Sequence, residues 1–183
     1  ISVGLPSHRW LKDAEYSKTN VAYNKETIVS NNNKKGNSWK LVDDYSNSWF
    51  HVQTGSNIAP YVQIDLGKTY NLDSIEVDKG NNFGLPIGEF EIWGSNQENF
   101  LEYKMIAEST AEKNPFVYSD STCWSADLTG NKFRYIRLVG TNKKEFVLRD
   151  IRVYSADEEA YSTSICRYNK ISNNIFTDVA NYY

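Results

Sequence analysis

The segment YVQIDLG, residues 61–67, alternates aliphatic and polar side chains along its length. A period of two places one set of side chains in a core and the other set outside, as in a β-strand with one buried face. Gly67 and Lys68 interrupt the alternation, which resumes at Ile75 and Val77. The pattern predicts two strands with a turn between them.

Similar short patterns follow along the chain. Phe90 and Ile92 alternate with polar neighbours in EFEIWGS, after a loop rich in glycine. Short strands separated by Gly and Asn are typical of antiparallel all-β proteins, and no rhythm of strand, helix and strand indicates a parallel sheet. The predicted fold class is therefore all-β. We expect further strands at residues 103–109, 133–140 and 146–155.

Composition and charge narrow the choice of partners. The chain has 183 residues, 40% of them hydrophobic, which is enough for one good core, and a formal net charge of −3. No block of Lys and Arg offers a surface for phosphates, so we do not expect nucleic acid as a partner. No apolar run approaches the eighteen or so residues of a membrane span. The chain begins at Ile1 without an initiator Met, and we expect a piece of a larger protein.

Aromatic residues make up 14% of the chain, with 13 Tyr and 5 Trp, and Asn crowds several loops. This mixture suits surfaces that stack on sugar rings and hydrogen-bond hydroxyl groups. It suits an ordinary β-protein with Asn-rich turns equally well. Composition alone therefore leaves the two interpretations open.

The two ends of the chain differ in character from its middle. Residues 1–19 read as a leader over the surface, and residues 156–183 as an extension or the start of a neighbouring domain. Apolar residues at three- and four-residue steps in this extension predict a short amphipathic helix. They are Tyr168, Ile171, Ile175 and Val179.

The two cysteines, Cys123 and Cys166, are 43 residues apart and belong to no CxxC pair. This spacing argues against a zinc site. In a secreted protein they would form a disulfide, and in a cytosolic one they would be two buried thiols. The sequence does not decide between these alternatives.

Six segments, taken in order, resemble the discoidin family, also called the coagulation-factor type C domain. That family includes family 32 carbohydrate-binding modules and fucose-binding lectins. The agreement of six patterns in one order is more specific than any of them alone. The resemblance implies a jelly-roll-like antiparallel β-sandwich over residues 20–155. The segments are NVAYNKETIVSNN (20–32), LVDDYSNSWFH (41–51), YVQIDLG (61–67), EFEIWGSNQENFLEYKMIA (89–107), FRYIRLVG (133–140) and LRDIRVYS (148–155).

YVQIDLG matches the signature of this family most directly. Gln63 and Asp65 lie on the polar face of the predicted strand, and Gly67 provides a sharp exit from it. We interpret the motif as architectural and assign no binding residue to it.

The resemblance also implies a structural calcium site. In the carbohydrate-binding branch an Asp turn holds Ca²⁺ and the last strand adds a carboxylate, and Asp43, Ser48 and Asp150 fall on the matching positions. Ca²⁺ requires about six to eight oxygen ligands, which such a turn supplies from carbonyls, a carboxylate and a hydroxyl. Asp44 replaces the family's Gly, and an Asp tolerates a left-handed turn position. The alternative is that Asp43 caps its turn and Asp150 pairs with Arg149 or Arg152.

A ligand of such a sandwich binds in loops at one end, so the resemblance implies a glycan site there. The loop after the second signature strand, DKGNNFGLPIGE, carries Lys79 where the family has Arg, followed by Asn81, Asn82 and Phe83. His51 and Trp39 are further candidates. Lys is a point donor rather than a planar fork, so we expect modest affinity or a different preferred sugar.

Each of these residues also has a structural interpretation. Asn81 and Asn82 suit a turn, Phe83 can fold under its loop, Trp39 can belong to the core, and a lone His at a strand start is often structural. We expect the loop as a whole to bind a glycan of the galactose, fucose or N-acetylhexosamine type.

Three other functions are compatible with a small β-domain. An enzyme is disfavoured because the chain has two histidines and no GxSxG, HExxH or phosphate-binding motif, while Glu89 and Glu91 read as a solvated strand face rather than a glycosidase pair. Membrane binding through Phe83 and Leu85 is disfavoured because Lys79 alone would meet anionic headgroups. A protein-docking or adhesion role stays open, since the fold serves all these purposes. The prediction is a non-catalytic carbohydrate-binding domain of an extracellular or cell-surface protein, with Ca²⁺.

Overall fold

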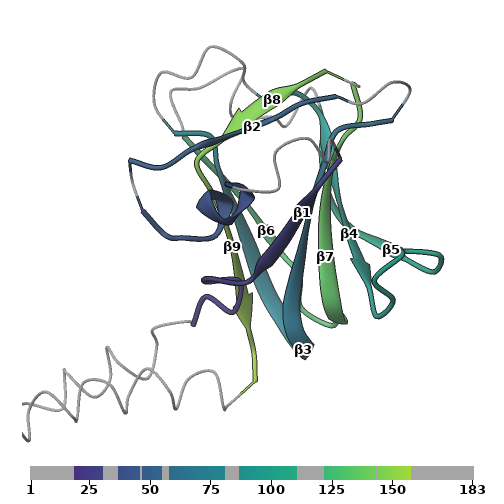
Figure 1. The fold of residues 1–183 in the computed structure, drawn as a ribbon. Coiled ribbons are helices and arrows are strands. Elements are labelled where there is room, and N and C mark those ends of the chain that lie inside the picture. The colour runs from purple at the N-terminus through teal and green to yellow at the C-terminus, as the bar shows by residue number, and fades with distance from the viewer. Residues whose placement is uncertain are drawn as a thin grey trace, which may run out of the picture.

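A computed structural model describes residues 19–30, 37–45, 47–54, 58–80, 87–110, 122–142 and 144–157. These residues form antiparallel β-structure and one turn of 3₁₀ helix, which confirms the predicted all-β class (Figure 1). The expected strands at 103–109, 133–140 and 146–155 are present within one or two residues, the last one split by Arg149. The elements are β1 (Glu26–Val29), η2 (Ser38–Leu41), β2 (Phe50–Val52), β3 (Tyr61–Asp78), β4 (Phe90–Ser95), β5 (Lys104–Ser109), β6 (Cys123–Asp127), β7 (Lys132–Gly140), β8 (Phe146–Leu148) and β9 (Asp150–Ser155).

The strand β3 belongs to both layers of the sandwich. Its first half pairs with β1 and β7 in a layer of order β1-β3-β7-β4-β5, and its second half pairs with β6 and β9. The sequence predicted two strands with a turn at Gly67 and Lys68. The structure instead has one strand from Tyr61 to Asp78 that bends at these residues. The register with β7 shifts between Asp65 and Tyr70. Gly67 has φ +89°, a left-handed conformation that suits glycine, and its N–H donates to Asp65 Oδ1.

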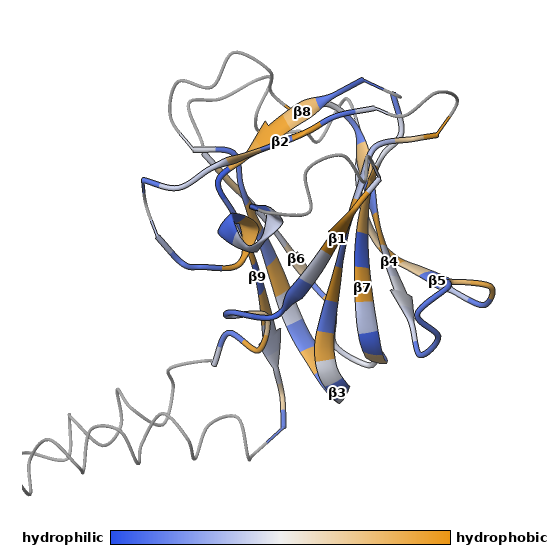
Figure 2. Ribbon diagram, in the orientation of Figure 1, coloured by the Kyte–Doolittle hydropathy of each residue, from blue (hydrophilic) through white to orange (hydrophobic). Residues whose placement is uncertain are grey.

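The core lies between the two layers, and the aliphatic residues that alternate along the sequence of β3 belong to it. Val62, Ile64 and Leu66 are buried, as are Ile75 and Val77 on the other half of the same strand. Figure 2 shows the resulting stripes of hydrophobic and hydrophilic residues along β3 and β7. Each large aliphatic side chain buried in this way contributes about 1.5–3 kcal/mol relative to an exposed one.

The short ribbon of β2 and β8 covers one end of the sandwich (Figure 1). The chain passes from β8 through Arg149 into β9, and Arg149 N donates to the carbonyl of Asp78 at the end of β3. The ends of β3, β8 and the start of β9 thus meet at this end of the molecule, which we call the loop pole.

The first and last described segments of the chain, near residues 20 and 156, are both bonded to the sandwich. Asn20 bridges Tyr154, and Ala156 N donates to the carbonyl of Asn71. The predicted leader up to residue 18, the predicted helix beyond 157 and Cys166 lie outside the described residues. None of the helices described is long and apolar enough to cross a membrane.

Candidate functional site

The loop pole is held by the buried side chain of Asp78. Its Oδ1 accepts a hydrogen bond from Gly80 N at 2.7 Å, and its Oδ2 accepts one from Arg149 Nη2. Lys79 lies between these anchored residues, half-buried, and its backbone N donates to Thr122 O at 2.9 Å. The start of the predicted ligand loop therefore has a fixed backbone. The loop residues Asn81, Asn82 and Phe83 lie outside the described residues.

His51 occupies the centre of β2, opposite Val147 of β8. Its Nε2 lies 3.2 Å from Glu145 Oε2, so the imidazole has a carboxylate partner beside the pole. Phe50 and Val52 on either side are buried, whereas His51 is half-buried and Trp49 is 47% exposed. Because alternate residues of an extended chain point the same way, Trp49 and His51 face away from the core together.

Trp49 is the residue that the sequence analysis missed at this pole. The signal was available in SWFHV, where the same period of two that assigns Phe50 and Val52 to the core assigns Trp49 to the face of His51. Trp39, the aromatic residue that was selected, lies on η2 and is 50% exposed, so it does not belong to the core.

The predicted calcium turn folds around the hydroxyl of Ser48. Ser48 Oγ lies 2.7 Å from Asp43 Oδ1, 2.9 Å from the carbonyl of Tyr45 and 3.4 Å from the carbonyl of Lys40. Asp44 has φ +55°, which agrees with the expected left-handed position in the turn. Asp43 also accepts a hydrogen bond from Tyr45 N, as a turn cap does. The turn therefore gathers carboxylate, hydroxyl and carbonyl oxygens within a small space.

Asp150, the carboxylate predicted to join this turn, is 1% exposed. Its pKa is raised to about 7, chiefly by burial and also by the neighbouring carboxylates of Asp44 and Asp43, although Arg152 acts in the opposite direction. Arg152 Nη2 lies 2.9 Å from Asp150 Oδ2, and Arg152 Nε donates to Asp44 Oδ1 at 2.7 Å. Arg152 Nη1 also lies 3.4 Å from Glu76 Oε2, so three carboxylates share this guanidinium.

These oxygens have the chemistry that Ca²⁺ binds, but they are arranged around Arg152. In the described residues, no group of three His, Cys, Asp or Glu side chains stands in a geometry that could hold a metal ion. Asp150 Oδ2 is buried, and in the described residues its contact with Arg152 is an ion pair without hydrogen-bond alignment. The donors fit calcium in kind, and binding would require Arg152 to give up its contact with Asp150.

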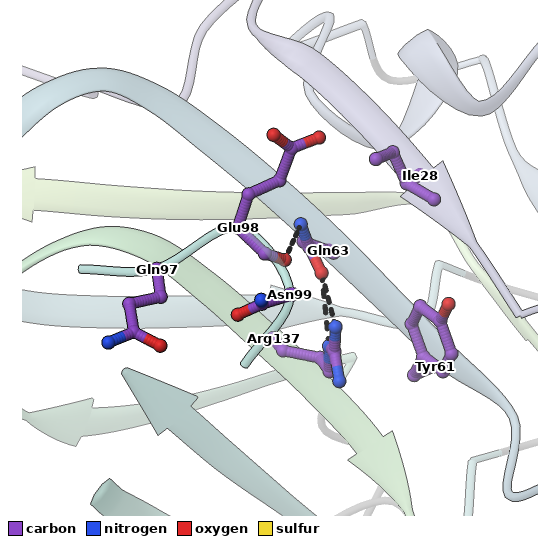
Figure 3. Close-up of a pocket in the computed structure, with 7 residues that line it drawn as sticks. All are labelled: Ile28, Tyr61, Gln63, Gln97, Glu98, Asn99 and Arg137. Carbon is purple, nitrogen blue, oxygen red and sulfur yellow. Dashed lines mark hydrogen bonds between the residues drawn. The ribbon is translucent and has the colours of Figure 1, made fainter. Parts of the chain in front are cut away.

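A second feature lies on the outer face of the β1-β3-β7 sheet (Figure 3). It is a groove of about 530 Å³, and we call it the sheet groove. Tyr61 and Gln63 of β3 and Arg137 of β7 form its floor, Ile28 of β1 forms one wall, and residues 97–99 form the other. No ligand was predicted for this face from the sequence.

Gln63 connects the floor of the groove to its wall. Its Nε2 donates to the carbonyl of Glu98 at 3.1 Å, and its Oε1 accepts from Nε and Nη2 of Arg137. Gln63 is 3% exposed, so this motif residue has the architectural role that was expected, although it lies under the 97–99 loop rather than on an open polar face. Gln63 and Arg137 are direct partners across β3 and β7.

The sequence matches the family model of the F5/8 type C domain over residues 22–151. Since the match covers most of the chain, the protein belongs to this family, and the resemblance to discoidin domains is confirmed. No curated protein sequence matches the chain.

Solved structures of similar fold include several modules named for binding sugars. A Streptococcus pneumoniae fucose binding module is 21% identical, with a TM-score of 0.58 over 76% of this chain and 99% of that one. A chitosan-binding module from Paenibacillus sp. IK-5, solved with chitotriose, is 17% identical, with a TM-score of 0.59 over 74% and 100%. The lectin domain of lectinolysin, complexed with Lewis B antigen, is 17% identical, with a TM-score of 0.58 over 75% and 97%. At these identities the likeness establishes the shared β-sandwich fold.

Proposed function

We propose that this protein is a non-catalytic carbohydrate-binding module that holds a glycan at the loop pole. The observation that carries the proposal is the exposure of Trp49, which directly precedes β2, beside the half-buried His51 at the centre of that strand. Sugars offer an apolar ring face and a rim of hydroxyls, so an exposed indole beside a hydrogen-bonding imidazole matches both. Lys79 adds an ammonium donor at the end of β3. The solved modules named above bind fucose, chitotriose or Lewis B antigen, which supports the ligand class.

The same pole supports a ligand of the galactose, fucose or N-acetylhexosamine type. Lys79 donates as a point charge, so it suits one or two hydroxyl oxygens better than a bidentate grip on a diol. The absence of a catalytic role is part of the proposal. Glu91, one of the two carboxylates considered as a glycosidase pair, accepts a hydrogen bond from Trp93 Nε1 at 2.7 Å within β4, which lies between β7 and β5.

We further propose that Ca²⁺ binds the turn of Asp43, Ser48 and Asp150, with Asp44 as an added carboxylate. The ion would neutralise charges that Arg152 alone now balances. It would stabilise the link between the turn and the last strand without touching the glycan. An extracellular or cell-surface location, in a larger multidomain protein, is consistent with a calcium-loaded glycan binder.

The test is a glycan array followed by titration calorimetry in calcium. Wild type is compared with Trp49→Ala and His51→Ala, and with Tyr103→Ala as a control. Tyr103 is also exposed, but it stacks on Trp93 at the far edge of the sheet. We expect Trp49→Ala to abolish detectable binding, His51→Ala to weaken it about tenfold and Tyr103→Ala to leave it unchanged. An array on which wild type binds no glycan would sink the proposal.

A further inference from the structure

The sheet groove holds Arg137, whose charge has no carboxylate partner among the described residues. In the described part of the chain, Arg134, Arg149 and Arg152 each pair with an acidic side chain. Arg137 instead donates to the neutral amide of Gln63. Burial lowers the pKa of Arg137, as expected for a cation without a counter-ion. Burying half of a charged guanidinium without a counter-ion costs desolvation free energy, which suggests that the charge serves a ligand.

Aromatic rings fix the plane of this guanidinium. Its carbon lies 3.8 Å from the ring centroid of Phe100 and 4.5 Å from that of Tyr61. Cation–π contacts of this type compensate part of the lost hydration and restrict rotation of the group. Phe100 is buried, and Tyr61 lines the groove. The arginine is therefore held in one orientation before any ligand arrives.

One edge of the guanidinium is left for a ligand. The group has five N–H donors, and Gln63 takes one from Nε and one from Nη2. The remaining donors are on Nη1 and Nη2, and this edge has the fork geometry that matches a carboxylate. The side chain of Arg137 makes no other hydrogen bond among the described residues, and it lines the groove.

The wall of the groove is as firmly held as its floor. Gln97 N donates to Ser95 Oγ at 2.9 Å, and Ser95 Oγ donates to the carbonyl of Glu102 at 2.6 Å. Gln63 fastens the carbonyl of Glu98 from below. In Figure 3 the amides of Gln97 and Asn99 lie on the same side of the groove, while the carboxylate of Glu98 points away from Arg137. The wall thus offers amides for hydroxyl groups around one cation.

The size of the groove corresponds to a sugar rather than to a macromolecule. Its volume of about 530 Å³ lies within the range of small-ligand sites. A smaller hollow of about 260 Å³ adjoins it and shares Ile28, Gln63 and Glu98. The second hollow contains the internally paired Arg134 and Asp65, so the unpaired charge is confined to the Arg137 end.

We propose that the sheet groove is a second binding site, for a sugar unit that carries a carboxylate. The carboxylate pairs with the Nη1 and Nη2 edge of Arg137, and ring hydroxyls bond the amides of residues 97–99. The inference rests on the proposed function and deepens it by adding an acidic glycan to its ligands, but the groove is lined by other residues than Trp49 and His51.

Calorimetry with matched acidic and neutral sugars tests this site. Trigalacturonate is compared with galactotriose, and 3′-sialyllactose with lactose. The first pair tests a hexuronate as the ligand and the second tests a sialate. Arg137→Met should abolish binding of the acidic probe, and Arg137→Lys should weaken it at least tenfold because the fork is lost. Lys104→Met removes the same charge on the exposed edge strand β5 and should have little effect.

A gain of affinity provides a second readout. Glu98→Gln removes the one acidic side chain among the described residues that line the larger groove, and it should increase the affinity for the acidic probe several-fold. If Arg137→Met does not fold, Glu98→Gln still tests the site. The substitution keeps the backbone carbonyl of residue 98 that accepts a hydrogen bond from Gln63. Unchanged affinity in Glu98→Gln, or no binding of either acidic probe to wild type, would overturn the inference. Acidic binding that Trp49→Ala abolishes and Arg137→Met preserves would overturn it too, while leaving the proposed function at the loop pole intact.

Discussion

Arg134 donates two parallel hydrogen bonds to Asp65, from Nε to Oδ1 and from Nη2 to Oδ2, each 2.8 Å long. The pair spans β3 and β7 where the register between them shifts. Asp65 also accepts a hydrogen bond from Gly67 N. A single carboxylate therefore holds the bend of β3 at Gly67 and joins it to Arg134 of the neighbouring strand β7. The acidic residue of the YVQIDLG motif therefore positions the point at which the strand passes from one layer to the other.

This pair gives a stability that depends on pH. The hydrogen bond from Arg134 is the largest cause that lowers the pKa of Asp65 below its usual 3.8. The folded state thus favours the ionised carboxylate, and its stabilisation is complete above pH 3.8 and disappears as the pH falls through the folded-state value. We expect Asp65→Asn to be less stable than wild type at pH 7 and to lose less stability on acidification. Urea denaturation at pH 7, 4 and 3 measures both, with Arg134→Met as the matching variant. Parallel curves for all three proteins would contradict the assignment.

Calcium should raise the melting temperature through the turn of Asp43 and Ser48. We expect an increase that grows with calcium concentration in wild type and disappears in Asp150→Asn, which lacks the buried ligand charge. Differential scanning calorimetry in calcium and in chelator tests this. Asp157→Asn, a carboxylate bonded to Asn71 at the opposite end, is the control and should respond to calcium as wild type does. A transition that chelator leaves unmoved would end the calcium hypothesis.

Lys79 should tune affinity at the loop pole. Removing its ammonium in Lys79→Ala costs a charged hydrogen bond, worth about 1.5–3 kcal/mol, and so weakens glycan binding roughly tenfold or more. Lys79→Arg restores a planar fork and should tighten binding of sugars with vicinal hydroxyls. Titration calorimetry with the best array ligand measures both changes, and Lys104→Ala serves as the exposed control. Equal affinities across the series would remove Lys79 from the site.

Gly94 should be sensitive to a single methyl group. A Cβ at this position would lie 2.7 Å from Cε2 of Phe133, closer than side chains can approach without a shift. We expect Gly94→Ala to reduce the free energy of unfolding by about 1–3 kcal/mol. Phe133→Ala removes the clashing ring, so the second substitution should cost much less in that background. Chemical denaturation of the four proteins in a double-mutant cycle checks this, and additive effects would rule out the clash.

The fold was predictable because its determinants are local. The alternation of Val62, Ile64 and Leu66 identifies a strand without knowledge of its partners, and six such segments in family order specify the sandwich. The bend at Gly67 was misread as a turn because a break in alternation looks the same whether the chain reverses or changes layers. Only the partners of the two halves distinguish these cases.

The site was less predictable because it depends on distant pairs. Gln63 and Arg137 are separated by 74 residues and meet only because β7 pairs with β3. Nothing in YVQIDLG indicates that its glutamine lies beside an unpaired cation. Likewise, the contact of Arg152 with Asp44 depends on where β9 meets the turn, although pairing of Asp150 with an arginine was one of the alternatives read from the sequence. Trp49 is different, since its alternation with Phe50 was visible and was not used.

The course of β3 has a consequence for how this protein can be divided. The strand is central in both sheets, between β1 and β7 and then between β6 and β9. Cleavage between Asp65 and Tyr70 would leave each sheet with half of a shared backbone, and neither fragment would retain a complete core. Complementation of the two fragments should therefore be all-or-none, with each acquiring its structure only when it finds the other.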